Sequence, residues 1–366
     1  MADFVRIPAD PHVVHSRPVA INYGTTASPE VVVFYGGNDG TLRAINGNRS
    51  AANGGVSAGE EYWAFIPPEF YGNIKRLRVN DGSVDAPYIT YPGTIKVNTA
   101  AKAYGMDGSV TAYWNDANGD GDLKDASDEA FLYATMRRGG RVLYAFDVST
   151  PGSPSLKWKK GCPYNFTAPG VVSDTDCTTG FSGIGQTWSA PTTFFAAGYG
   201  SGNSPLLIMG GGYDTCEDVD TGVANNSCGA NPKGSEIYVL DADTGSRLIT
   251  LNTERSVVGD IIVAKDSSDL GIYAYASDTG GNVYRITMGA AAPGAWTITK
   301  IATLGCNTGT TCNPNRKFIY SPDVVHDSAS GIYYLTLGSG DREKPLETYL
   351  ATAGVTNYFF MLQDKP

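Results

Sequence analysis

The sequence has few charged residues, few histidines and no long apolar segment. Asp, Glu, Lys and Arg make up 17% of its 366 residues, against about 25% in an ordinary soluble domain. Acidic residues outnumber basic ones by 37 to 27, which argues against a nucleic-acid partner because phosphate binding needs clustered Lys and Arg. No run of about 18 apolar residues occurs, so no transmembrane segment is expected.

Helix signals are also scarce, whereas turn residues are abundant. The chain contains 45 Gly and 20 Pro, and the best helical candidate is the short string EFYGNIKRLRV at 69–79. Val, Ile, Tyr and Phe recur in short runs that alternate roughly every second residue, which is the signature of strands. These features predict an all-β protein.

One unit recurs along the chain: a β run, a turn rich in Gly and Asp, and a second β run. Clear copies are VVVFYGGNDGTLRAIN at 31–46, FLYATMRRGGRVLYAFDVS at 131–149 and GIYAYASDTGGNVYRIT at 271–287. Stacked repeats can exceed the size limit of a single core. We predict one modified β-propeller domain over 1–366, with an extended lead-in at 1–28 and long loop insertions. Five blades are readable, and degenerate copies would raise the number to six or seven.

The six cysteines fall in three near-neighbour couples within polar, turn-rich loops. The couples are Cys162/Cys177, Cys216/Cys228 and Cys306/Cys312. No C-x-x-C motif and no nearby His accompany them, so a zinc site is not expected. Local pairing is the simplest of the many possible connectivities, and closing a loop of about 15 residues contributes roughly 3 kcal/mol. Disulfides indicate an oxidising compartment, the periplasm or the cell surface.

The start of the chain lacks the features of a secretory signal. MADFVRIPADPHVVH has neither a basic n-region nor an apolar h-region. Together with the expected disulfides, this suggests a piece of a longer exported protein.

The string WNDANGDGDLKDASDEAF at 114–131 resembles a calcium-binding loop. Oxygen-bearing side chains alternate there, and Gly121 stands at the sixth position, as in the EF-hand pattern. The expected ligands are Asp116, Asn118, Asp120, Asp122 through its carbonyl, Asp125 and Asp128. Ser127 replaces the bidentate Glu of the pattern, which predicts weak calcium binding of order 10⁻⁴–10⁻³ M. The alternative is a solvated acidic hairpin tip.

No arrangement of catalytic residues is apparent in the sequence. Its Gly-rich strings do not continue into a phosphate loop, and no Ser–His–Asp or Cys–His pattern occurs. We therefore expect a non-enzymatic protein. Most of the 22 tyrosines lie in strand runs, but three are expected in exposed loops, where they would form a recognition surface. These are Tyr164, Tyr199 and Tyr213.

Several strings resemble the C-terminal domain of the PilC/PilY family of type IV pilus biogenesis and tip-adhesin proteins. They include YGGNDGTLRAIN at 35–46, GEEYWAFIPPEFYGNIKRL at 59–77, GGRVLYAFDVSTP at 139–151 and NYFFMLQDKP at 357–366. The resemblance implies a modified β-propeller of about seven blades, carried at the pilus tip or outer membrane. It also implies roles in pilus assembly, opposition to retraction, twitching motility and attachment, with minor pilins and a host-cell receptor or surface as partners.

The chain departs from the family at one calcium loop and leaves two other functions open. Where the family often has D-x-[DN]-x-D-G-x-x-D, this sequence reads AKDSSDLG and keeps only Asp266 and Asp269, so calcium is not expected there. The alternatives to a pilus factor are a lectin-like carbohydrate-binding propeller and a quinone-dependent dehydrogenase propeller. The vicinal Cys pair of the dehydrogenases is absent.

Overall fold

The computed structural model of the chain describes residues 15–74, 104–163, 172–218, 228, 231–309, 312, 314–342 and 355–366. Packing divides the chain into two compact units. The first comprises Met1–Gly140 and Tyr144–Leu156, and the second comprises Arg141–Leu143 and Lys157–Pro366. Strands β7 and β8 therefore each contribute residues to both units.

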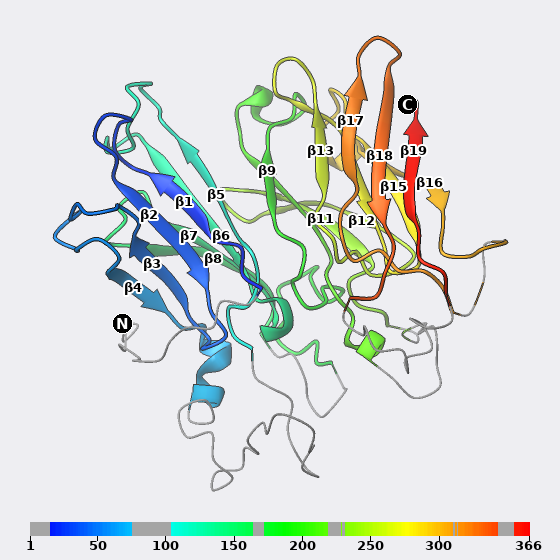
Figure 1. Cartoon of the computed structure of the whole chain (residues 1–366), viewed down its shortest axis with the longest axis horizontal. Helices are drawn as coiled ribbons and strands as arrows, with labels where there is room; N and C mark the ends of the chain where they lie inside the picture. Colours follow the sequence, from blue (N-terminus) through cyan, green and yellow to red (C-terminus); the bar gives the residue numbers. More distant parts are fainter. Residues whose placement is uncertain are drawn as a thin grey trace, which may run out of the picture. The chain divides into compact units, whose positions relative to one another are not determined.

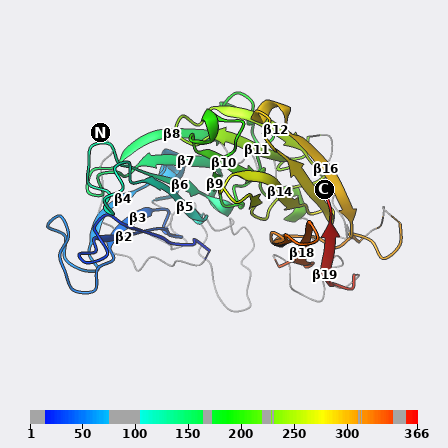
Figure 2. The same cartoon turned by 90° about the horizontal axis from the view of Figure 1, so that it is seen from above.

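The described residues form five antiparallel sheets, and in each sheet the strands follow one another in chain order (Figure 1). The first sheet contains β1 (Val19–Asn22), β2 (Val31–Gly36), β3 (Leu42–Asn46) and β4 (Glu61–Phe65). The second contains β5 (Val110–Asn115), β6 (Glu129–Thr135), β7 (Arg141–Asp147) and β8 (Ser155–Cys162), which lie side by side in Figure 2.

The remaining three sheets belong to the second unit. They are β9 (Thr192–Phe194), β10 (Leu206–Gly210), β11 (Glu236–Asp241) and β12 (Arg247–Asn252); β13 (Ile262–Lys265), β14 (Gly271–Ser277), β15 (Asn282–Thr287) and β16 (Thr297–Thr303); and β17 (Asp323–Asp327), β18 (Ile332–Gly338) and β19 (Phe359–Asp364). Short 3-10 helices connect some strands: η1 (Pro68–Asn73), η2 (Arg137–Gly139), η3 (Gly200–Gly202), η4 (Thr215–Asp218) and η5 (Pro293–Ala295). The predicted all-β, propeller-like class is confirmed, with five sheets in the described part of the chain.

Apolar layers between successive sheets form the core of the second unit. Ile208 of β10 and Val239 of β11 belong to one buried cluster with Ala274 of β14 and Ile286 of β15. A second cluster joins Tyr275 and Val283 of β14 and β15 to Leu335 and Leu337 of β18. The sheet β13–β16 is thus buried on both faces, as in stacked propeller blades.

Aromatic side chains fill the core of the first unit. The ring of Trp63 on β4 lies 5.9 Å from that of Phe34 and 6.5 Å from that of Phe146. The indole nitrogen of Trp63 donates to the carbonyl of Pro151 at 2.8 Å. Burial of large rings with the polar group satisfied explains why this sheet carries the aromatic string EYWAF.

The lead-in and the helical candidate each contain a short regular element. Val19–Asn22 within the expected lead-in form β1, which pairs with Val31–Phe34 of β2. The helical candidate at 69–79 overlaps one 3-10 segment, η1, and residues 75–79 lie outside the described part. Pro68 begins η1 because its fixed φ suits the first position of a helix.

Glycine is required at the repeated turns because the turns pack closely. Gly40 is the glycine of the NDG turn and has a φ of +93°, and a side chain there would collide with the ring of Phe70. Gly281, between β14 and β15, has φ of +81°, and a side chain there would collide with the backbone of Gly305. Only glycine adopts such a φ without strain.

Candidate functional site

The acidic loop predicted to bind calcium closes the β5–β6 hairpin of the first unit. Asn115 pairs with Glu129, so residues 116–128 form the connection. The carboxylate of Asp116 accepts the backbone N–H groups of Gly119 at 2.7 Å and Gly121 at 2.8 Å. Both glycines have positive φ, +73° and +91°. The loop is therefore folded around the side chain of its first acidic residue.

Contacts with neighbouring segments fix both sides of this loop. The backbone N–H of Leu123 donates to the carbonyl of Tyr23 at 3.0 Å, and Leu123 is buried. Asp128 is also buried, and its two carboxylate oxygens accept the N–H groups of Ala117 at 3.0 Å and Asp125 at 2.9 Å. Asp128 thus closes the base of the loop, which is a structural role.

The amide of Asn118 lies between two carboxylates inside the loop. Its Nδ2 donates to Oδ2 of Asp120 at 3.0 Å and to Oδ2 of Asp125 at 2.5 Å. Desolvation and the neighbouring charges of Asp120 and Asp128 raise the pKa of Asp125. Hydrogen bonds from the backbone of Asp122 and from Asn118 lower the pKa of Asp120. The two carboxylates are directed at one donor, which is an arrangement that a cation would stabilise further.

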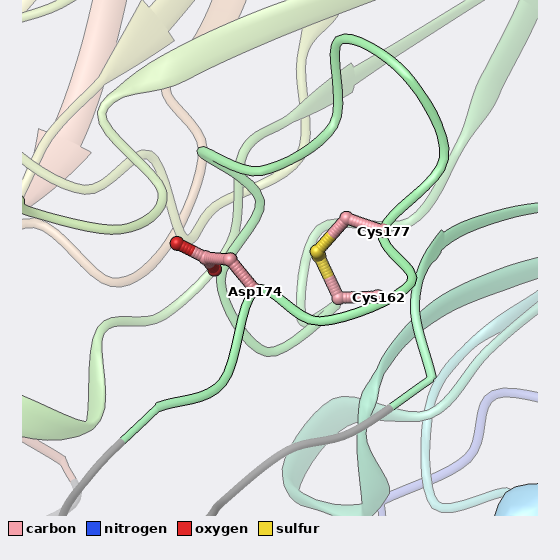
Figure 3. Close-up of side chains that lie close together, drawn as sticks. All are labelled: Cys162, Asp174 and Cys177. Atoms are coloured by element: carbon pink, nitrogen blue, oxygen red, sulfur yellow. A yellow bond between two sulfur atoms is a disulfide. The ribbon is translucent and has the colours of Figure 1, made fainter.

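The carboxylates of this loop are not gathered as tightly as in a closed metal site. Among the described residues, two groups bring three acidic, Cys or His ligand atoms within 4.8 Å of one another, and neither belongs to the loop. One group is Cys162, Asp174 and Cys177, shown in Figure 3, and the other is Asp214, Cys216 and Cys228. In each group the two sulfurs form a disulfide, so they offer no thiolate to a metal.

All three cysteine couples form disulfides in the pairing expected from the sequence. The pairs are Cys162–Cys177, Cys216–Cys228 and Cys306–Cys312. Each closes a short segment of 15, 12 or 6 residues in the second unit. Local loop closure, rather than a link between distant strands, is therefore their structural effect.

Asp174 lies between two buried cations rather than beside a metal. Arg141, with 1% of its side chain exposed, donates to Asp174 Oδ1 at 2.9 Å, and Lys233 donates to Oδ2 at 2.7 Å. Burial alone would raise the pKa of Asp174, but the hydrogen bonds from Lys233 and Arg141 outweigh it and the pKa is lowered. The carboxylate neutralises charges that burial would otherwise make costly.

A second buried ionic cluster surrounds Glu217 of η4. Its carboxylate accepts Arg255 at 2.6 Å, Lys317 at 2.7 Å and the hydroxyl of Thr279 at 3.0 Å. Burial opposes ionisation of Glu217, but Lys317 and Arg255 lower its pKa overall. The members of this cluster are far apart in the chain and no spacing connects them, so the sequence did not predict it.

The three tyrosines expected in a recognition surface have different environments. Tyr213 is buried, with 3% exposure, and its ring stacks on Trp188 at 4.6 Å, so the prediction that it is exposed was wrong. Tyr199 is half-buried and donates to Asp241 at 2.6 Å; burial and that carboxylate raise its pKa to about 12. Tyr164 lies outside the described residues.

Other large apolar side chains are exposed instead. They are Tyr71, Trp114, Leu156, Tyr320, Val325, Tyr358, Phe359 and Met361. Arg342 donates to the hydroxyl of Tyr320 at 2.6 Å, and Arg316 lies over the ring of Tyr358 at 4.6 Å. The exposure of these residues was not predicted from the sequence. The string NYFFMLQD at 357–364 contains a continuous apolar run without alternation, so no local pattern distinguishes its exposed side chains from its half-buried ones.

These observations define a propeller-like β domain with three disulfide-closed loops, in which no helix of the described segments is long and apolar enough to cross a membrane. No family model matches the chain. It is 25% identical over 305 residues to the type IV pilus biogenesis factor PilY1 of Pseudomonas aeruginosa strain UCBPP-PA14, a match that covers 82% of the chain and 20% of PilY1. The chain thus spans about a fifth of that relative's length.

The structural comparison agrees with the sequence comparison. The crystal structure of the Pseudomonas aeruginosa PilY1 C-terminal domain matches with a TM-score of 0.50 and 17% identity, over 85% of this chain and 53% of that one. The predicted resemblance to the C-terminal domain of the PilC/PilY family is confirmed. A quinohemoprotein alcohol dehydrogenase from Comamonas testosteroni gives a TM-score of 0.42 and 12% identity over 84% of this chain and 42% of that one, which is too distant to indicate function.

Proposed function

We propose that this chain is a non-enzymatic domain of a type IV pilus assembly factor and tip adhesin. The observation that carries the proposal is the sequence similarity to PilY1 along 82% of the chain. The domain would promote pilus extension, counter retraction and support twitching motility and attachment. Its partners would be minor pilins of the pilus tip complex and a host-cell receptor or surface.

The disulfides support an extracytoplasmic location for this role. Three closed loops in one unit are typical of proteins that fold in an oxidising compartment. We place the protein at the pilus tip, outer membrane or cell surface, reached through the periplasm. The sheets of the domain would present their connecting loops there to other subunits, without enzymatic chemistry.

Calcium binding in the 116–128 loop is part of the proposal. Carboxylate, amide and carbonyl oxygens are the donors that calcium takes, and Asp116, Asn118, Asp120 and Asp125 carry them on one loop with two positive-φ glycines. The carbonyl of Asp122 would supply a further oxygen. Calcium would offset the repulsion between the carboxylates and fix the loop, while Asp128 continues to hold its base.

A genetic experiment tests the pilus role. The gene would be deleted in the bacterium that carries it and restored either as the full-length protein or without residues 15–366. Surface pili and twitching should be lost without the domain, and pili should reappear when retraction is also disabled. Normal numbers of pili in the strain that lacks the domain would contradict an assembly role.

Carbohydrate binding is the second candidate function. Exposed Tyr320 provides an aromatic ring with the guanidinium of Arg342 beside it, and such a pair suits a sugar ring. A glycan array with the chain and with Tyr320→Ala tests it. Binding that disappears in the variant would support the lectin-like alternative, and no binding by either protein would exclude it for the glycans on the array.

A further inference from the structure

We propose that the open edge of β19 is a docking site for an extended segment of a partner protein, which adds to the sheet as a fourth strand. The other four sheets of the described residues have four strands, whereas β17–β18–β19 has three. In two sheets of the same unit the fourth strand pairs with the third, as β12 does with β11 and β16 with β15. Within the described segments, no strand pairs with the side of β19 that faces away from β18.

Strand β19 is held firmly in place, so its edge is a formed surface. It pairs with β18 over six residues, from Tyr333↔Asp364 to Gly338↔Phe359. The carboxylate of Asp364 accepts Arg285 Nη1 of β15 at 2.7 Å and the hydroxyl of Tyr275 at 2.9 Å. These bonds to the neighbouring sheet fix the register of the strand and therefore which side chains point outward.

The outward row of β19 is apolar and exposed. Phe359 is 75% exposed and Met361 is 65% exposed, while Phe360 and Leu362, which alternate with them, are half-buried against the neighbouring sheet. Proteins usually protect an edge strand with Lys, Pro, a bulge or a covering segment. The string FFML contains neither Lys nor Pro, and β19 pairs with β18 in a continuous register without a bulge. An edge with unprotected backbone groups and exposed apolar side chains suits strand addition.

The two four-stranded sheets of the second unit indicate the composition of the segment that would add to β19. Strands β12 (RLITLN) and β16 (TITKIAT) are short, antiparallel to their neighbours and rich in Ile, Leu and Thr. A partner segment of about six residues with Ile, Leu or Val at alternate positions would cover Phe359 and Met361 and pair with the open backbone groups. Flanking Lys or Arg would favour its association because the chain carries a net charge of −10.

A second copy of the chain fits this edge less well. In a two-fold antiparallel pair of β19 strands centred on Met361, the exposed Phe359 of one copy would lie opposite Gln363 of the other. Pairing an apolar ring with an amide loses the favourable cross-strand contact. A different protein with a continuous apolar row is therefore the better occupant.

Peptide binding tests the proposal on the complete chain. The probe is a fluorescent peptide with the β12 sequence RLITLN, in which Ile and Leu stand at alternate positions, between terminal lysines. Its anisotropy would be measured with the chain and its variants. Met361→Lys, at an exposed position of the edge strand, should weaken binding about tenfold or more. Val325→Lys is the matched control, because Val325 is 63% exposed but lies on β17 at the far side of the sheet, and it should change binding less than about twofold.

Two further measurements distinguish strand addition from other outcomes. A peptide N-methylated at alternate residues should not bind, and the unmodified peptide should slow hydrogen exchange of amides in 359–364. Equal binding of the methylated peptide would overturn the proposal in favour of apolar contact alone. A dimer in sedimentation that Met361→Lys dissociates would identify a second copy as the occupant, and protection of all β19 amides in the free monomer would mean that its own chain covers the edge.

Discussion

The ammonium group of Lys317 lies 2.7 Å from Oε2 of Glu217, and both side chains are buried although the residues are 100 positions apart. Arg255 shares the same carboxylate at 2.6 Å. The cluster links η4 to the segments before β13 and β17. Removing Glu217 takes away the carboxylate that both cations share, although Asp341 also lies 3.1 Å from Lys317.

The first prediction concerns this buried cluster. Glu217→Gln should lower the free energy of unfolding by about 3 kcal/mol or more, measured by urea denaturation. Lys265→Ala is the control, since its pair with Asp269 is largely exposed and its loss should change stability by less than about 1 kcal/mol. A variant at 217 as stable as the native chain would show that the cluster contributes little.

The same cluster predicts a pH dependence. The folded-state pKa of Glu217 lies below its ordinary value, so its stabilisation is present above the ordinary glutamate pKa of about 4.3. It is lost as pH falls from there through the folded pKa, where the carboxylate is protonated. The difference in unfolding free energy between native and Glu217→Gln proteins should therefore shrink below about pH 4. A difference that is constant with pH would contradict this assignment.

Calcium should raise the melting temperature of the chain through the acidic loop. Asp116→Ala with Asp120→Ala should abolish that shift, because it removes two oxygens of the proposed shell. Asp266→Ala is the matched control: Asp266 caps the β13–β14 turn by accepting the N–H of Ser268 at 2.8 Å and of Leu270 at 3.0 Å, and Asp269 pairs with Lys265. A calcium response that survives the double substitution would place the site elsewhere.

The disulfides should contribute unequally to stability. Replacing Cys162 and Cys177 by Ser should cost about 3 kcal/mol, and replacing Cys306 and Cys312 about 2 kcal/mol, because the closed segments differ in length. Thermal unfolding of the two double variants measures this difference. Digestion without reductant followed by mass spectrometry should find the three local pairs, and a long-range pair would contradict the structure.

Substitution of a buried tyrosine should lower stability, whereas substitution of an exposed one should affect attachment alone. Tyr213→Ala should lower stability by about 3 kcal/mol, because it removes a buried ring stacked on Trp188. Tyr320→Ala should leave stability unchanged within about 0.5 kcal/mol and reduce attachment of whole cells to a surface if this face is adhesive. Attachment that falls only with Tyr213→Ala would indicate an effect of misfolding rather than recognition.

Alternation and turn chemistry predicted most strands but not the environment of single side chains. GIYAYASDTGGNVYRIT at 271–287 gives β14 and β15 around a glycine turn, since strand and turn preferences are local. Tyr213 follows a run of glycines and therefore resembles a loop residue, yet its burial depends on Trp188, which no local pattern reveals.

For the acidic loop, too, the sequence predicted the local structure but not the environment of each side chain. Its spacing correctly located a loop of alternating oxygen donors with glycine at the turn. The spacing did not indicate that Asp128 is buried with both oxygens bonded to backbone N–H groups. That role depends on the distance between two ends of the loop, which only the folded hairpin determines.

Arg141 has a consequence for how far the protein depends on its first disulfide. Besides Asp174, its guanidinium binds the carbonyls of Ser173 at 2.6 Å, Ser182 at 3.0 Å and Ile184 at 2.7 Å. These bonds hold the chain on both sides of Cys177 and are insensitive to reductant. The Cys162–Cys177 disulfide is therefore not the only constraint on this segment, and we expect its native course to persist when the disulfide is reduced.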